Sequence, residues 1–217
     1  MEGFTKRKWV AITLAAVILP MSLLTTFKLT GIIPEPITPE TFVVEAKSWS
    51  GERTPRATAL KEKIANSYSD DLASINFEVS VGTYCVGDST WNYLDFLNLH
   101  ISASANITEG FIYSMDVKFL KGNNYTSAMK IFQDSALLEL QNLQIEKFHS
   151  SWSGSDEAYI TTTAKAKPTE CQLICNVNWI FINQNVDDNA TATLETTYFN
   201  GTTYQKIVMP IHLFIQT

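Results

Sequence analysis

The amino-acid sequence predicts a mainly β protein, an antiparallel β-sandwich with one short amphipathic helix, preceded by a single N-terminal transmembrane helix. Two observations indicate the sandwich. Apolar and polar residues alternate with a period of two over most of the chain after residue 72, and turn-forming residues separate the alternating runs. A third observation, an uncharged apolar run near the N-terminus, indicates the membrane helix. Because 45% of the 217 residues are hydrophobic, the chain can bury a core.

Residues 9–27, WVAITLAAVILPMSLLTTF, contain no charged side chain. As a helix this run would be roughly 28 Å long, close to the ~30 Å thickness of the bilayer hydrocarbon. Residues 1–8 contain three consecutive basic residues, which predict a cytoplasmic tail. A cleaved signal peptide is the alternative, but its apolar region is usually about 7–15 residues long, and no small-residue cleavage site follows Pro20. We therefore expect an uncleaved signal-anchor that contacts the lipid bilayer and leaves the rest of the chain outside the cytoplasm.

A short stalk and an acidic ectodomain follow the anchor. Residues 28–41 contain Pro34, Pro36 and Pro39, a spacing that favours an extended, semi-rigid polyproline II segment. Residues 28–217 carry 13 basic and 21 acidic residues, and the ectodomain proper is predicted at 42–217. This acidic balance excludes nucleic acid as a partner, because binding phosphates requires cationic side chains.

The ectodomain is expected to open with a short strand at Phe42 and then to form its one helix, at about residues 55–72. Thr54 is a suitable N-cap and Pro55 a suitable first-turn residue. The apolar positions of this segment recur every four residues, which is typical of a helix that packs on a sheet. They are Leu60, Ile64, Tyr68 and Leu72.

The remaining segments are predicted to form about eight or nine strands. Strict alternation predicts strands at 75–81, 97–107 and 111–119, with a tight reversal at Thr108–Gly110. Asn200-Gly201 predicts a type I′ hairpin turn between the last two strands. Pro210 cannot donate to a ladder, so the last strand is expected at an edge or to be bulged. Residues 125–148 are compatible with a helical turn.

The three cysteines predict a disulfide. Cys171 and Cys175 share one face of a predicted strand but would lie roughly 13 Å apart, too far to bond each other. Cys85 ends another alternating run in phase with its apolar face. Outside the cytoplasm, a disulfide from Cys85 to Cys171 or to Cys175 is therefore expected.

Metal and cofactor binding have little support in the sequence. The oxygen-rich segment 183–189 resembles a calcium loop only in part, because it lacks the turn glycine and the distal glutamate of an EF-hand. A solvated connection between strands explains it equally well. The histidines show no metal-ligand spacing, so no metal and no cofactor are predicted. The weak calcium candidates are Asn183, Asn185, Asp187 and Asp188.

Four Asn-x-Ser/Thr sequons lie in the predicted extracytoplasmic part and are candidate glycosylation sites. Asn200 has a second role as a turn residue. The expected glycoprotein sites are Asn106, Asn124, Asn189 and Asn200.

No catalytic residue is predicted, because the chain has no nucleophile elbow, no phosphate-binding glycine loop and no paired His-Glu helix. The favoured hypothesis is a single-pass membrane-anchored extracytoplasmic β-sandwich with a binding, adhesion or envelope-assembly role and a protein or glycan partner. One alternative is a pilin-like or appendage subunit whose apolar helix packs in a filament. Another is a membrane-anchored hydrolase whose site is spread over several loops.

Overall fold

The computed structural model describes residues 38–52, 59–85, 95–122, 127–132, 139–150, 157–181 and 186–216. The chain divides between Thr38 and Pro39 into two units, and all described residues except Thr38 belong to the second unit. The predicted cytoplasmic tail, anchor and most of the stalk lie outside the described residues. Within the described part, no helix combines the length and the hydropathy that a membrane crossing requires.

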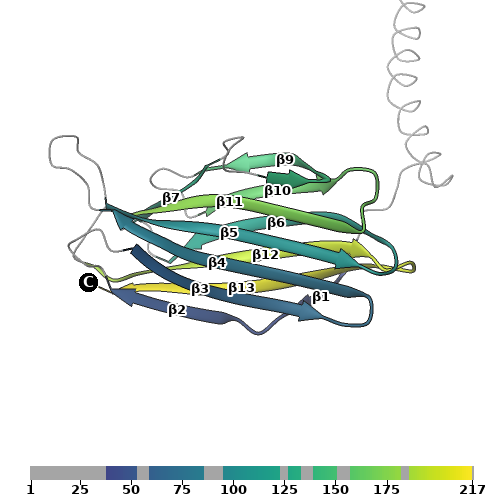
Figure 1. Cartoon of the computed structure of the whole chain (residues 1–217), viewed down its shortest axis with the longest axis horizontal. Helices are drawn as coiled ribbons and strands as arrows, with labels where there is room; N and C mark the ends of the chain where they lie inside the picture. The colour runs from purple at the N-terminus through teal and green to yellow at the C-terminus, as the bar shows by residue number, and fades with distance from the viewer. Residues whose placement is uncertain are drawn as a thin grey trace, which may run out of the picture. The chain divides into compact units, whose positions relative to one another are not determined.

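The second unit is a two-sheet β-sandwich, as predicted (Figure 1). One sheet, called sheet A, has the order β1-β13-β12-β6-β10-β9, with β2 also paired to β13. The other, sheet B, has the order β3-β4-β5-β11-β7, with β8 also paired to β11. The strands of sheet A are β1 (Glu40–Val43), β2 (Lys47–Glu52), β6 (Phe111–Lys121), β9 (Leu143–His149), β10 (Glu157–Ala164), β12 (Asp188–Phe199) and β13 (Tyr204–Gln216). Those of sheet B are β3 (Ala59–Ser69), β4 (Ala73–Cys85), β5 (Asp95–Ile107), β7 (Ser127–Phe132), β8 (Glu139–Gln141) and β11 (Glu170–Phe181).

The described residues thus contain 13 strands, more than the eight or nine expected. The ladders are antiparallel except that β1 and β2 pair in parallel with β13. Alternation explains the core, because every second residue of a strand points to the same face. In β5, for example, the odd-numbered residues from Asp95 to Ile107 are all buried. The largest side chains of the core come from both sheets: Phe77, Phe119, Trp179, Phe181 and Tyr198.

The predicted helix at 55–72 is wrong over its described part, because Ala59–Ser69 forms strand β3. β3 pairs antiparallel with β4, so that Ile64 lies opposite Val79 and Tyr68 opposite Ile75. The four-residue spacing is an even number and therefore also places residues on one face of a strand. Thr54 and Pro55 lie outside the described residues, and Leu72 follows the strand in a turn closed by Asp70, whose Oδ1 accepts the Leu72 N–H.

The two predicted turns both reverse the chain, but Asn200-Gly201 does not form the expected two-residue hairpin turn. The reversal at Thr108–Gly110 joins β5 of sheet B to β6 of sheet A. Gly110 has a φ of 102°, and a Cβ there would lie 1.7 Å from the Phe199 carbonyl oxygen, so the position requires glycine. The β12–β13 hairpin has four loop residues, in which the Asn200 Oδ1 accepts the N–H groups of Thr202 and Thr203.

One ladder of sheet A is interrupted opposite Pro210, and we call this interval the Pro210 break. The β1 register ends with Val43 opposite Val208, and the β2 register begins with Lys47 opposite Ile211. The expectation that β13 is an edge strand or bulged is wrong, since β13 lies inside the sheet and its neighbour is interrupted instead. A side chain from sheet B fills the interval. Asn66 of β3 is 3% exposed, and its Nδ2 donates to the carbonyls of Glu45 at 3.1 Å and Pro210 at 3.2 Å.

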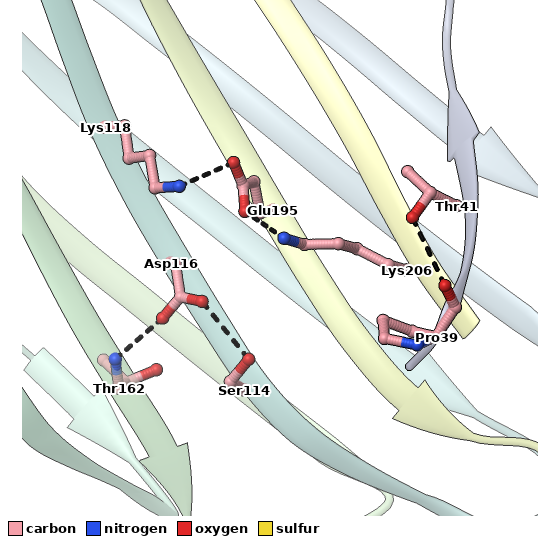
Figure 2. Close-up of polar contacts among 8 residues, drawn as sticks. All are labelled: Pro39, Thr41, Ser114, Asp116, Lys118, Thr162, Glu195 and Lys206. Atoms are coloured by element: carbon pink, nitrogen blue, oxygen red, sulfur yellow. Dashed lines mark hydrogen bonds and ion pairs between the residues drawn. The ribbon is translucent and has the colours of Figure 1, made fainter. Parts of the chain in front are cut away.

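A second interruption lies between β6 and β10, and we call it the Thr162 break. The β10–β6 register ends with Ile160 opposite Val117. Beyond it, Thr162 replaces the ladder with its side chain: its Oγ1 accepts the Met115 N–H at 3.1 Å and donates to the Met115 carbonyl at 2.6 Å. The Thr162 N–H donates to Asp116 Oδ1 at 2.8 Å (Figure 2). Thr162 is 1% exposed, so these bonds are shielded from water.

Candidate functional site

A pocket of about 300 Å³ opens beyond the Thr162 break, where β6 separates from the chain that follows β10. The separated segments meet again where the Ile112 N–H donates to the Pro168 carbonyl at 2.8 Å. The pocket therefore lies between two fixed points of the backbone. The side chains that matter for its chemistry are Phe111, Tyr113, Lys167 and Tyr204, with Ala164 and Ala166 beside them.

A β-bulge presents Tyr113 to the pocket. In the β12–β6 register, Thr197 lies opposite Ser114 and the next residue, Tyr198, lies opposite Ile112. Tyr113 is therefore an extra residue of β6 without a partner in this register. Bulges of this kind re-aim a side chain, and Tyr113 is 38% exposed although plain alternation would place it on the same face as the buried Met115 and Val117.

Aromatic rings form the wall of the pocket. The Tyr204 ring stands nearly perpendicular to those of Phe111 and Tyr113, with centroid distances of 6.3 Å and 5.9 Å. Phe199 packs behind them, 5.4 Å from Phe111 and 5.1 Å from Tyr204. Edge-to-face pairs of this kind stabilise each other by about 0.5–1.5 kcal/mol beyond their burial, so the wall is rigid.

The opposite side of the pocket is a turn in an unusual conformation. Ala166 and Lys167 have φ values of 51° and 53°, a region that costs an L-residue roughly 1–2 kcal/mol. The turn is held by a bond from the Lys165 N–H to the Asn142 carbonyl at 2.8 Å. It places the Lys167 Nζ 5.1 Å from the centre of the Phe111 ring, a cation–π contact. Backbone strain held in this way is found preferentially at functional sites.

The chemistry of the pocket is that of a binding site. It offers ring faces, two phenolic hydroxyls and one ammonium group, and Lys167 is the single charged side chain among its described lining residues. The pocket can hold a flat, partly apolar ligand that carries negative charge.

A second hollow, of about 350 Å³, lies on the outer face of sheet B between β4, β5 and β11. Its lining is mostly polar and includes Asn106 and Glu170, which are joined by a 2.9 Å bond from Asn106 Nδ2 to Glu170 Oε1. The same face carries a bond from Asn98 to Asn178 at 2.9 Å. Because no aromatic side chain lines the hollow, we favour the aromatic pocket as the candidate site.

The outer face of sheet A carries an ion-paired cluster across three strands (Figure 2). Glu195 of β12 accepts hydrogen bonds from Lys118 of β6 at 2.8 Å and from Lys206 of β13. Burial alone would raise the pKa of Glu195, but the bonds from the two lysines outweigh it and lower the pKa. Burial raises the pKa of the neighbouring Asp116. The cluster ties β6, β12 and β13 together.

The predicted disulfide is wrong, because Cys171 and Cys175 are free and buried. β5 lies between β4 and β11, so positions along β5 give the distance between Cys85 and the other two cysteines along the strand direction. Cys85 is opposite Phe96 of β5. Cys175 is opposite Ile101 and Cys171 is opposite Ala105. Five and nine residues of strand correspond to about 17 Å and 30 Å, far beyond the ~4.4–6.8 Å Cα separation of a disulfide. Burial raises the pKa of Cys171 to about 11 and of Cys175 to about 12, so both remain thiols.

The calcium candidates do not come together as a site in the part that the structure describes. Asn183 and Asn185 lie outside the described residues. Asp187 is exposed, whereas Asp188 is buried at the start of β12, where its Oδ1 accepts the Asn189 N–H at 2.8 Å. Among the described residues, no three histidine, cysteine or acidic side chains form a metal-binding group.

The sequons occupy different surroundings. Asn106 and Asn189 are exposed on strands, and Asn200 is half-buried in the β12–β13 loop. Asn124 lies outside the described residues. Glycosylation at these positions stays a prediction.

The aromatic pocket is absent from the sequence predictions. Phe111 and Tyr113 fit an ordinary alternating strand, and Lys167 lies in a polar connection that carries no motif. The available signal is the accumulation of aromatic residues directly after Gly110 and on both sides of Gly201. The bulge and the left-handed residues that make it a pocket depend on pairing between distant segments.

No family model and no curated protein matches this chain. Among solved structures, it is similar to the collagen-binding domain of a Staphylococcus aureus adhesin, at 11% identity over 53% of this chain and 87% of that one, with a TM-score of 0.27. It is also similar to the collagen-binding subdomain of the Enterococcus faecalis surface protein ACE. That match covers 61% of this chain and 92% of the subdomain, at 6% identity and a TM-score of 0.28. A third similar structure is AggA, the major subunit of aggregative adherence fimbriae type I from Escherichia coli. The match covers 70% of this chain and 99% of AggA, at 13% identity and a TM-score of 0.30. Scores of this size do not establish a shared fold or function.

Proposed function

We propose that this chain is a membrane-anchored, extracytoplasmic β-sandwich that binds a component of the cell envelope in its aromatic pocket. The observation that carries the proposal is the pocket itself, in which a rigid aromatic wall faces a single ammonium group held by a strained turn. A few polar groups that converge in a mostly apolar hollow are typical of ligand sites. The uncharged run at residues 9–27 supports the anchor.

The position of the pocket supports an envelope ligand. Glu40, the first residue of β1, lies opposite Gln205, the neighbour of Tyr204 in the pocket wall. The chain therefore enters the sandwich at the same end that carries the pocket. A ligand bound there lies at the end of the sandwich where β1 begins, and we propose a component of the cell's own envelope as that ligand.

The proposal is tested in cells that express the full chain with a tag after Thr217. We expect the tag to be accessible to an impermeant label in intact cells. We also expect purified, detergent-solubilised protein to be retained by isolated envelope material, and Tyr113→Ala to abolish most of that retention.

Tyr159→Ala is the matched control, because Tyr159 lies on β10 of the same sheet and stacks on His149 at 5.3 Å, away from the pocket. Equal retention of the two variants, or a tag that only permeabilised cells expose, would contradict the proposal.

A further inference from the structure

We propose that the pocket takes an acidic sugar, a carboxylate-bearing pyranose unit of a glycan, with its ring against the aromatic wall and its carboxylate on Lys167. The inference rests on the proposed binding function and adds the chemical class of the ligand.

The size of the pocket fits one such unit. Its volume of about 300 Å³ lies at the lower end of the roughly 300–1,000 Å³ range of ligand pockets, which suits a single ring rather than an extended chain. The C–H-rich face of a pyranose packs on aromatic rings, and Tyr113 and Tyr204 combine such rings with hydroxyl groups at their edges. A sugar ring with equatorial hydroxyls matches this mixture of apolar faces and polar edges.

The charge of the pocket selects an acidic ring. The whole chain has a net charge of −6, yet the described lining residues include one cation and no carboxylate. Lys165 stands two residues before Lys167, so this turn carries two cations within an acidic protein. A charge-assisted bond between an ammonium and a carboxylate is about twice as strong as a neutral one.

The single ammonium favours a carboxylate over a phosphate group. Phosphate sites usually combine a cation with a bidentate arginine, a glycine-rich loop or a helix N-terminus. The described lining residues contain no arginine and no glycine, and they come from strands and a turn. The Phe111 ring holds the Lys167 ammonium in place and leaves its N–H donors for one carboxylate.

The test measures binding of a β-linked glucuronic acid trimer and of the neutral glucose trimer with the same linkage to the full chain in detergent, by isothermal titration calorimetry. We expect the acidic trimer to bind at least about tenfold more tightly than the neutral one. Lys167→Gln should abolish this preference and Lys167→Arg should keep most of it. Lys165→Gln is the matched control and should leave the preference unchanged, because Lys165 does not line the pocket.

Equal binding of the two trimers, an unchanged preference in Lys167→Gln, or no binding of either trimer would overturn the proposal. So would competition by acetate or phosphate at the concentration of the trimer, since the site would then recognise charge alone. If envelope retention depends on Tyr113 while the acidic trimer does not bind, the binding function stands and the sugar class is wrong. If retention is also independent of Tyr113, both proposals are wrong.

Discussion

The Pro210 break and the Thr162 break are two interruptions of the same sheet, on either side of β12, and they have opposite consequences. Each is closed by a buried polar side chain that replaces missing backbone partners, Asn66 in the first and Thr162 in the second. Asn66 comes from the other sheet, so its bonds join the two sheets over the interruption. Thr162 comes from the neighbouring strand, and beyond it the backbone stays apart and forms the aromatic pocket.

The origin of the substituting side chain decides whether an interruption of the sheet is filled or left open. A side chain from the opposite sheet must cross the core, so it removes the space as well as satisfying the carbonyls. A side chain from the adjacent strand satisfies the local groups and leaves the space beyond it free. The first interruption therefore stabilises the sandwich, and the second leaves a pocket.

The largest expected effect is at the Pro210 break. Asn66→Leu keeps the approximate volume but removes the buried donor to the carbonyls of Glu45 and Pro210, which should lower the free energy of unfolding by about 2–4 kcal/mol. Urea unfolding of the full chain in mild detergent, followed by near-ultraviolet circular dichroism, measures the change. Asn76→Leu, at an exposed asparagine of β4, is the control and should change stability by less than about 0.5 kcal/mol. Equal effects would show that Asn66 does not join the sheets.

A smaller loss is expected at the Thr162 break. Thr162→Val removes the hydroxyl that serves both the N–H and the carbonyl of Met115, at an expected cost of about 1–3 kcal/mol. Thr162→Ser keeps the hydroxyl and should recover most of this loss, and Thr161→Val tests the half-exposed neighbour. The same unfolding measurement applies. A serine variant as unstable as the valine variant would attribute the effect to packing instead of the hydrogen bonds.

Glu195 connects the strands that carry the two breaks, because it binds Lys118 of β6 and Lys206 of β13. Its lowered pKa means that the folded state holds fewer protons than the unfolded state. Its contribution to stability is therefore complete above the ordinary pKa of 4.5 and is lost as the pH falls through the lowered value. Glu195→Gln should cost about 1 kcal/mol at pH 7 and little at pH 3, measured by urea midpoints across this range.

Asp116 provides a control of opposite sign at the Thr162 break. Its pKa is raised, so the folded state favours the protonated carboxyl, and stability from this group increases as the pH falls through the raised value toward 3.8. Asp116→Asn should remove that increase while its side-chain oxygen still accepts the Thr162 N–H. A variant with the same acid profile as the original chain would show that Asp116 is not shifted.

The smallest expected effect is a gain in the turn that closes the pocket. Ala166→Gly removes the strain of a φ of 51°, while glycine adds about 0.5–1 kcal/mol of unfolded-state entropy. The net expectation is a gain of about 0.5 kcal/mol in thermal unfolding experiments. Ala164→Gly, within β10 and without a left-handed backbone, should instead lose stability.

Local patterns in the sequence predict the fold well where they need no information about distant pairing. The alternation from Leu97 to Ile107 is enough to identify β5 and its buried face. The pattern fails where two structures share a period, as in β3, whose spacing of four residues fits a helix and a strand equally. It also fails where register decides the outcome. The distance from Cys85 to Cys171 depends on how β4 and β11 pair with β5. The exposure of Tyr113 depends on a bulge in the pairing of β6 with β12.

The parallel pairing of β1 and β2 with β13 has a mechanical consequence. A pull on the chain that precedes Thr38, directed along the strand axis, would draw β1 lengthwise past β13 instead of peeling it away. The hydrogen bonds of a ladder lie across the strands, so such a force loads all four residue pairs of β1 together, in shear. Asn66 adds a bond to Glu45, between β1 and β2, that the same force must break before it reaches β2. A domain pulled from this end must therefore break the β1 pairing before β13 or the strands beyond it lose their partners.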